Sequence, residues 1–128
     1  MEAIERAEAV LIAPSNPFLS VDPLLAIPAI RSALKRTAAP VVAVSPLIAG
    51  QAIKGPTAKL MAELGMVVDN DSIARHYGDL IDGMLIDSGD DCIAAGVKIA
   101  RCPTLMRTDE DKRRVAAAAL ALAVGLRS

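Results

Sequence analysis

The sequence predicts an α/β fold in which a mainly parallel sheet is covered by helices on both faces, as a three-layer sandwich. Apolar runs of strand length alternate with stretches of helix length along all 128 residues, and this alternation is typical of parallel sheets. Hydrophobic residues make up 53% of the chain, but aromatic residues only 2%. The core must therefore consist of Ala, Val, Leu and Ile, which suits strands that are buried on both faces beneath Ala-rich helices.

Charge and composition exclude several classes of function. The chain has 14 Lys and Arg against 15 Asp and Glu, whereas nucleic-acid binding favours a basic stripe with aromatic platforms. Charged residues interrupt every apolar run before it is long enough to span a membrane, and the first residues do not resemble a signal peptide. Cys92 and Cys102 form neither a disulfide framework nor a metal-ligand spacing, so we interpret them as free thiols of a cytoplasmic protein.

The first part of the chain predicts two strands with a helix between them. A short helix that leads directly into a central, wholly apolar strand is typical of an incomplete domain, and the Pro14–Pro17 turn ends that strand. Ser20 or Asp22 would cap the next helix, in which Pro28 either causes a kink or delays the start. The expected elements are a helix over 2–7, a strand over 9–13, a helix over 22–37 and a strand over 41–45.

The second part predicts further alternation of helices and strands. Gly65 and Gly96 are suitable helix ends, and Thr108 with Asp111 resembles a capping box in which Asp replaces the usual Glu. The expected elements are helices over 56–64, 72–77, 91–95 and 109–125, a short extended segment over 66–68, and strands over 83–87 and 97–100.

Functional interpretation centres on the stretch 45–56, which lies between the second strand and a helix start. Backbone N–H groups near Gly50 and Gly55, the helix start and the ammonium of Lys54 could together bind phosphate oxygens. The order of a Walker A loop is absent. Alternatively, the glycines and prolines only shape the connection, and Lys54 is a solvated charge; the residues alone leave both readings open.

Polar residues after the first strand and near the end of a helix are further candidates. Ser15 and Asn16 follow the first strand, where Asn could read a base edge or a carbonyl, or could form an ordinary Asx turn. His76, next to Arg75, is the only histidine and could bind phosphate or transfer a proton. A lone His at a helix end more often caps carbonyls, and no nucleophile or metal ligand lies near it in sequence.

A group of carboxylates surrounds the strand over 83–87. Carboxylates at a strand end can hold Mg²⁺, but they also serve as caps and as solubilising charges, which we expect for most of them. Asp87 has the best position for a metal because it ends the strand. The group consists of Asp79, Asp82, Asp87, Asp90 and Asp91.

Taken in chain order, these residues resemble the C-terminal part of the 2-phospho-L-lactate transferase (CofD-like) family. The resemblance covers essentially all 128 residues, and it identifies 1–128 as the C-terminal part of one transferase domain with a Rossmann-like sheet. The motifs that carry it are Ala13–Pro17, Ile27–Pro28 with Ile30–Arg31, Pro40–Pro46, Gly50, Lys54–Pro56, Ala74–Tyr77, Asp79–Gly83 and Thr104–Met106.

The resemblance implies a transferase that acts in biosynthesis of the deazaflavin coenzyme F-420. Such an enzyme moves a 2-phospholactyl or phosphoenolpyruvyl group from a guanosine-diphosphate-activated donor to Fo, a deazaflavin alcohol, with Mg²⁺ as cofactor and with release of GMP. No catalytic residue and no metal ligand is assigned, since the reaction needs charge neutralisation more than a nucleophile. The implied substrate-binding residues are Ser15, Asn16, Ser45, Pro46, Lys54 and Gly55 on the nucleotide side, with Arg75 and His76 near the same cleft.

The sequence departs from the family in two ways. The Gly-Gly-Thr-Gly loop and the acidic metal ligands of the family's N-terminal half are absent, so we expect the chain to be inactive alone. Because half a sheet leaves an edge strand to cover, we expect association with an N-terminal half or with a second copy. Cys102–Pro103 stands where the family usually has Thr-Asp or Thr-Asn. The alternative function is a nucleotide-binding regulatory module of the CofD-related type.

Overall fold

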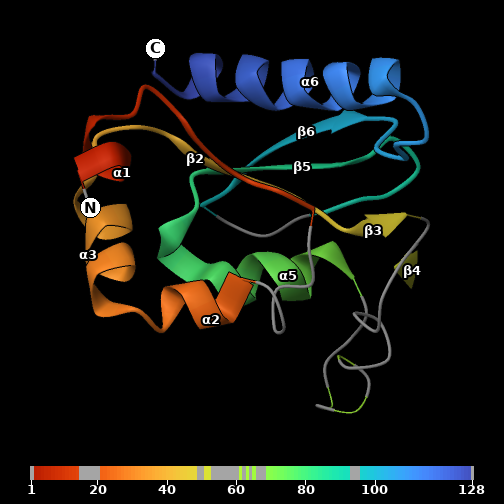
Figure 1. The fold of residues 1–128 in the computed structure, drawn as a ribbon. Coiled ribbons are helices and arrows are strands. Elements are labelled where there is room, and N and C mark those ends of the chain that lie inside the picture. The colour runs from red at the N-terminus through yellow and green to blue at the C-terminus, as the bar shows by residue number, and fades with distance from the viewer. Residues whose placement is uncertain are drawn as a thin grey trace.

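The computed structural model describes residues 2–14, 21–48, 51–52, 61, 63, 65, 69–92 and 96–127. Within these ranges four parallel strands form one sheet in the order β1-β2-β5-β6 (Figure 1), which confirms the predicted α/β class and its mainly parallel sheet. The strands are β1 (Val10–Ile12), β2 (Val41–Val44), β5 (Gly83–Asp87) and β6 (Lys98–Cys102).

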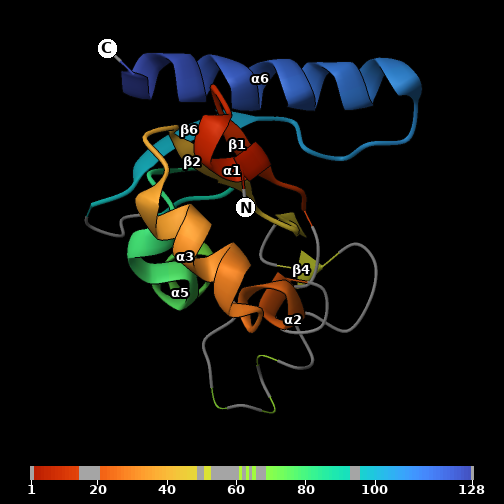
Figure 2. The same cartoon turned by 60° about the vertical axis from the view of Figure 1, so that its left-hand side comes forward.

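Helices cover both faces of the sheet, as a three-layer fold requires (Figure 2). The long helix α6 packs against β2, β5 and β6 on one face, and the remaining helices lie on the other face (Figure 1). The helices are α1 (Glu2–Arg6), α2 (Asp22–Leu25), α3 (Pro28–Arg36), α5 (Asn70–Tyr77) and α6 (Asp109–Arg127), and a single 3₁₀ turn, η2 (Gly78–Leu80), follows α5.

Alternation along the central strand β2 supplies both hydrophobic cores. Val41 and Ala43 belong to the cluster beneath α2, α3 and α5, whereas Val42 and Val44 belong to the cluster beneath α6. All four side chains are buried, because a strand in the middle of a covered parallel sheet contacts helices on both faces. Both clusters are mainly aliphatic, as the composition predicts, but the first also contains Met61, Met84, Cys92 and the ring of Tyr77.

The predicted helix over 22–37 is two helices, and Pro28 explains why. Ile27 is extended, with φ −78° and ψ 114°, and Pro28 occupies the first turn of α3. The residue before a proline is disfavoured in the helical region, so the chain breaks at Ile27 and the helix begins again. Pro28 therefore starts the second helix late, the second of the two outcomes that the sequence allows.

Capping residues determine two other helix starts. Asp69 caps α5, since its Oδ1 accepts a hydrogen bond from the Ser72 backbone N at 2.8 Å, and the helix therefore begins at Asn70 rather than at Ser72. The capping box of α6 is confirmed: the Asp111 N donates to Thr108 Oγ1 at 3.1 Å, and the Thr108 N donates to Asp111 Oδ2 at 3.1 Å.

Other segments differ from the sequence-based expectation. The strand predicted over 97–100 extends to Cys102. The stretch 45–56, expected as a loop, contains a short antiparallel pair, β3 (Leu47–Ile48) and β4 (Gln51–Ala52), because Leu47 is wholly buried in the core. Met61 and Glu63 are helical, but the rest of the helix predicted over 56–64, the segment 66–68 and residues 93–95 lie outside the described residues. None of the helices in the described ranges combines the length and the apolar character that a membrane span requires.

Candidate functional site

The carboxyl ends of the parallel strands meet at one edge of the sheet, which is where open α/β sheets bind ligands. In the described part of the chain, Ser45 and Pro46 follow β2, Asp87 ends β5, and Thr104 follows β6. The N-terminus of α5 lies at the same edge, since Asn70 contacts Ser45 there. This edge is therefore the candidate site.

Ser45 is held in place by a buried hydrogen-bond network rather than exposed to solvent. Ser45 and Asn70 are only 2% and 3% exposed. The Ser45 Oγ donates to Asn70 Oδ1 at 2.5 Å and accepts from the Leu47 N at 3.2 Å. Asn70 Nδ2 in turn donates to the Asp91 carbonyl at 3.4 Å. The hydroxyl of Ser45 thus joins the exit of β2 to the start of α5.

Half of the predicted substrate-binding residues can be placed. Ser45 and Pro46 lie at the carboxyl edge, and the half-buried Pro46 links Ser45 to β3. Arg75 and His76 lie on α5. The remaining four, Ser15, Asn16, Lys54 and Gly55, lie outside the described residues.

Arg75 and His76 are not brought together with Ser45. They occupy the last turn of α5, five and six positions after Asn70, which is roughly 8–9 Å along a helix axis. His76 Nε2 lies 2.7 Å from Asp22 Oδ1 at the start of α2. The exposed Arg75 donates from Nη2 to Ser72 Oγ at 3.3 Å.

The contact of His76 with Asp22 joins two helices and was not visible in the sequence. Asp22 was expected as a helix cap, but Val21 is the N-cap of α2 and no side-chain cap hydrogen bond is present there. The two side chains are 54 residues apart, so no local spacing indicates their contact. The neighbouring Tyr77 packs edge-on against the imidazole, with ring centroids 5.9 Å apart, and its burial raises the pKa of the phenol well above its usual range, with the charge of Asp22 adding to the effect.

Asp87, the carboxylate with the best position for a metal, accepts hydrogen bonds from the segment after β5 and from the segment after β6. Its Oδ1 accepts from the Thr104 N at 3.0 Å and from Thr104 Oγ1 at 3.3 Å, and its Oδ2 accepts from the Gly89 N at 3.3 Å. These hydrogen bonds, above all that from the Thr104 N–H, lower the pKa of Asp87. The sequence singled out Asp87 and named Thr104 only within the Thr104–Met106 motif. It gave no sign that the buried Thr104 contacts Asp87, because the two residues are 17 positions apart.

The other carboxylates are dispersed. Asp91 Oδ1 accepts from Arg101 Nη2 at 2.8 Å, and Asp82 Oδ2 accepts from the Val41 N at 2.8 Å at the opposite, amino end of the sheet. In the ranges that the structure describes, no group of three or more His, Cys, Asp or Glu side chains could hold a metal ion.

Arg114 fastens the connection from β6 to α6. Its guanidinium donates to the Pro103 carbonyl at 3.2 and 3.3 Å, to the Leu105 carbonyl at 3.3 Å and to Asp111 Oδ1 at 2.7 Å. The N–H of Arg107 and the guanidinium of Arg114 lower the pKa of Asp111 to about 2. These hydrogen bonds tie the segment 103–105 to α6.

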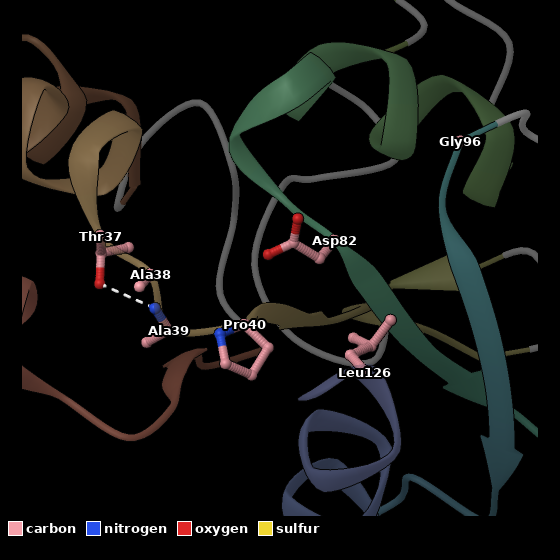
Figure 3. A pocket seen from close by; sticks show the side chains of 7 residues that line it. All are labelled: Thr37, Ala38, Ala39, Pro40, Asp82, Gly96 and Leu126. Carbon is pink, nitrogen blue, oxygen red and sulfur yellow. Dashed lines mark hydrogen bonds between the residues drawn. The ribbon is translucent and has the colours of Figure 1, made fainter. Parts of the chain in front are cut away.

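Cavities occur at the opposite end of the sheet. One has a volume of about 410 Å³ (Figure 3), and a second of about 250 Å³ shares Thr37, Ala39 and Asp82 with it. Pro40, Asp82 and Gly96 precede β2, β5 and β6, so both cavities lie at the amino ends of the strands. Among the described residues, Asp79 and Asp82 of the carboxylate group line them, but none of the predicted substrate-binding residues does. The larger cavity is lined by Thr37, Ala38, Ala39, Pro40, Asp82, Gly96 and Leu126.

Comparison with known proteins identifies a family of similar chains. The family model described as 2-phospho-L-lactate transferase CofD matches residues 1–121. A phosphoenolpyruvate transferase of Kitasatospora aureofaciens is 40% identical over 99% of this chain, and one of Thermobifida fusca is 39% identical over 99%. A phosphoenolpyruvate transferase of Mycolicibacterium smegmatis is 38% identical over 96%. The chain spans 41%, 39% and 39% of the length of these three relatives, about two-fifths in each case.

Proposed function

The chain belongs to the 2-phospho-L-lactate transferase (CofD) family, and we propose that it acts within a cytoplasmic transferase of deazaflavin coenzyme biosynthesis. The reaction moves a phosphoenolpyruvyl or 2-phospholactyl group from a guanosine-diphosphate-activated donor to the alcohol Fo, with Mg²⁺ as cofactor and GMP as the leaving product. The observation that carries the proposal is the family match over residues 1–121. The names of the similar relatives favour the phosphoenolpyruvyl donor.

The arrangement at the carboxyl edge supports this proposal. The buried hydrogen bonds of Ser45 fix the point at which the chain leaves β2, and Lys54 and Gly55 follow within ten residues. A group that must meet a diphosphate has to be positioned, and a fixed exit from β2 suits that requirement. The contact of His76 with Asp22 similarly fixes the start of α2, the first described element after Ser15 and Asn16.

The chemistry requires little of the protein beyond positioning and charge. The Fo hydroxyl oxygen forms a bond to the phosphorus that carries the phosphoenolpyruvyl or phospholactyl group, the bridging P–O bond of the diphosphate breaks, and GMP leaves while the hydroxyl proton passes to solvent. Lys54 is proposed to neutralise charge on the diphosphate, because positive groups aimed at developing charge lower such barriers. Among the described residues, no group of three or more His, Cys, Asp or Glu side chains could hold a metal ion, and no step is assigned to Mg²⁺.

Reconstitution tests the proposal. The chain is co-expressed with the segment of the Kitasatospora aureofaciens relative that it does not match, and GMP release and the Fo product are measured with phosphoenolpyruvyl and phospholactyl donors. We expect no turnover by the 128-residue chain alone and turnover by the reconstituted pair. A stable pair that neither binds guanine nucleotides nor releases GMP would refute the proposal, and tighter calorimetric binding of UDP-sugars than of GDP would favour the regulatory alternative.

Lys54→Ala in the reconstituted enzyme tests the role of the lysine. We expect kcat/KM for the donor to fall on the order of 100-fold, a magnitude typical of losing one charge-stabilising group. Lys35→Ala is the matched control, because Lys35 is an exposed lysine on α3 and should leave the kinetics unchanged. Unchanged donor affinity and turnover in Lys54→Ala would show that another group binds the diphosphate.

A further inference from the structure

The larger cavity at the amino ends of the strands lies away from the proposed transfer site and has the composition of a ligand site. Its volume of about 410 Å³ falls in the range of small-molecule sites, which are mostly apolar with a few placed polar groups. Apolar walls are formed by Ala38, Ala39, Pro40 and Leu126 (Figure 3). Among the described residues that line the cavity, Asp82 is the one with a charged side chain.

The carboxylate of Asp82 has one oxygen that the described residues leave unused. Its Oδ2 accepts a hydrogen bond from the Val41 N at 2.8 Å, which fixes the side chain beside the start of β2. None of the described residues donates to the other oxygen, Oδ1. Asp82 is exposed, so a ligand can reach that oxygen from solvent. A charged acceptor of this kind forms its strongest hydrogen bonds with a cationic donor.

Two helix ends add partial negative charge to the same cavity. Thr37 directly follows α3, Leu126 lies in the last turn of α6, and both residues line the cavity. The C-terminus of a helix is equivalent to roughly half a negative charge. No Lys or Arg is among the described residues that line the cavity, so its electrostatic character favours a cation.

Hydrogen bonds of Thr37 hold one wall of the cavity in place. Its Oγ1 donates to the Ile4 carbonyl at 2.9 Å and accepts from the Ala39 N at 3.2 Å, and the second contact is drawn in Figure 3. These bonds tie the segment between α3 and β2 to α1, and the ring of Pro40 restricts the same segment. Because the wall is fixed before a ligand arrives, binding costs less conformational entropy.

The smaller cavity is less suited to a cation. It shares Thr37, Ala39 and Asp82 with the larger one, but it is also lined by Asp79 and Lys35. The ammonium of Lys35 would repel a cation there. Its volume of about 250 Å³ also lies below the usual range of small-molecule sites.

We propose that the larger cavity binds a small organic cation, namely a protonated amine on an apolar body. The ammonium donates a hydrogen bond to Asp82 Oδ1, and the apolar body packs against Pro40 and Leu126. The site lies at the end of the sheet opposite to the candidate transfer site, and the inference does not rest on the transfer reaction proposed above.

Three probes that share one body test the preference for a cation. Cyclohexylmethylamine, cyclohexylmethanol and cyclohexanecarboxylate place a positive, a neutral and a negative group on the same ring. Each is titrated into the isotope-labelled 128-residue chain without nucleotide, and binding is followed by calorimetry and by amide chemical shifts. We expect a Kd on the order of 1 mM for the amine, as suits a ligand of this size, with shifts concentrated at Ala38, Ala39 and Gly96. The other two probes should bind at least about 10-fold more weakly.

Variants locate the bound amine. Asp82→Asn keeps an oxygen that can accept from the Val41 N but removes the charge, so it should weaken amine binding at least about 10-fold and leave binding of the alcohol unchanged. Ala38→Phe fills the cavity from an exposed position and should weaken both. Asp79→Asn is the matched control, because it removes the same charge from the smaller cavity alone. It should change the affinity for the amine by less than about 2-fold, since exposed charges are screened by salt.

Circular dichroism establishes that the chain and each variant are folded, and the reconstituted pair takes the place of the chain if the chain is not folded alone. Four results would overturn the proposal: no binding of the amine, binding of the alcohol or the carboxylate as tight as that of the amine, undiminished amine binding by folded Asp82→Asn or Ala38→Phe, or loss of amine binding in the reconstituted pair. The last result would mean that the rest of the family domain occupies the cavity. Amine binding in a reconstituted pair that releases no GMP would support the site and refute the reaction, so the two proposals fail separately.

Discussion

Two polar clusters lie at the carboxyl edge of the sheet, and they differ in charge and in burial. The Ser45–Asn70 pair is neutral and almost wholly buried, whereas the corner of Asp87, Thr104 and Arg114 is charged and partly open to solvent. Uncompensated charge is far more costly to bury than a hydrogen-bonded amide or hydroxyl. The comparison shows that a polar residue after a buried strand can serve the fold rather than a ligand, and that burial determines which kind of residue is used.

The largest effect is expected in the buried cluster, from Asn70→Ala. The change leaves the Ser45 hydroxyl and the Asp91 carbonyl without their present partner. A buried polar group that loses its partner costs about 1–3 kcal/mol, so we expect the free energy of unfolding to fall by about 2–3 kcal/mol. Urea unfolding followed by circular dichroism measures it.

A double-mutant cycle with Ser45→Ala sharpens this result. If the hydrogen bond between the two side chains carries the effect, the coupling energy should be about 1–2 kcal/mol, as is typical of residues in one network. Strictly additive losses would instead mean that Asn70 acts through its packing at the start of α5.

The stability that the charged corner contributes should depend on pH through Asp87. Since hydrogen bonds lower the pKa of the folded carboxyl, its contribution to stability is complete above the unfolded pKa of about 3.9 and is lost as the pH falls through the lower folded pKa. Asp87→Asn should therefore cost about 1 kcal/mol at neutral pH, and the difference from the unaltered chain should shrink below about pH 4.

Urea unfolding of both proteins at neutral pH and at several acidic pH values measures this difference. Asp79→Asn is a suitable control because Asp79 is exposed, and a surface substitution of this kind should change stability by less than about 0.5 kcal/mol. A difference between Asp87→Asn and the unaltered chain that is the same at every pH would show that the charge of Asp87 contributes nothing.

Local signals in the sequence were sufficient for most of the fold. The strand over 83–87 has the predicted bounds, and the box of Thr108 and Asp111 forms as expected, because both depend on residues that are close in sequence. Pro28 disfavours helix in the residue before it, but whether a helix kinks or restarts there depends on packing. The burial of Leu47 likewise depends on packing against residues that are distant in sequence. The short strand pair β3–β4 was therefore not predicted.

The contacts of the candidate site were not predictable from spacing. Ser45 and Asn70 are 25 residues apart, and Asp22 and His76 are 54 apart, so the partners meet only because the sheet brings their elements together. The sequence could mark Ser45 and His76 as polar residues near strand and helix ends. It could not show that the hydroxyl of Ser45 donates a hydrogen bond to the amide of Asn70, or that His76 joins two helices.

An effect as small as that of Asp87→Asn is expected from Thr108→Ala, at the residue just before α6. The substitution removes the oxygen that accepts from the Asp111 N at 3.1 Å, and losing an N-cap oxygen typically costs about 1 kcal/mol. Thr108→Ser keeps that oxygen and should retain nearly all of the stability in the same urea unfolding measurement. If both substitutions destabilise the chain equally, the threonine methyl rather than the cap is important. If neither does, then the hydrogen bonds of Arg114 to Pro103 and Leu105 suffice to position the helix.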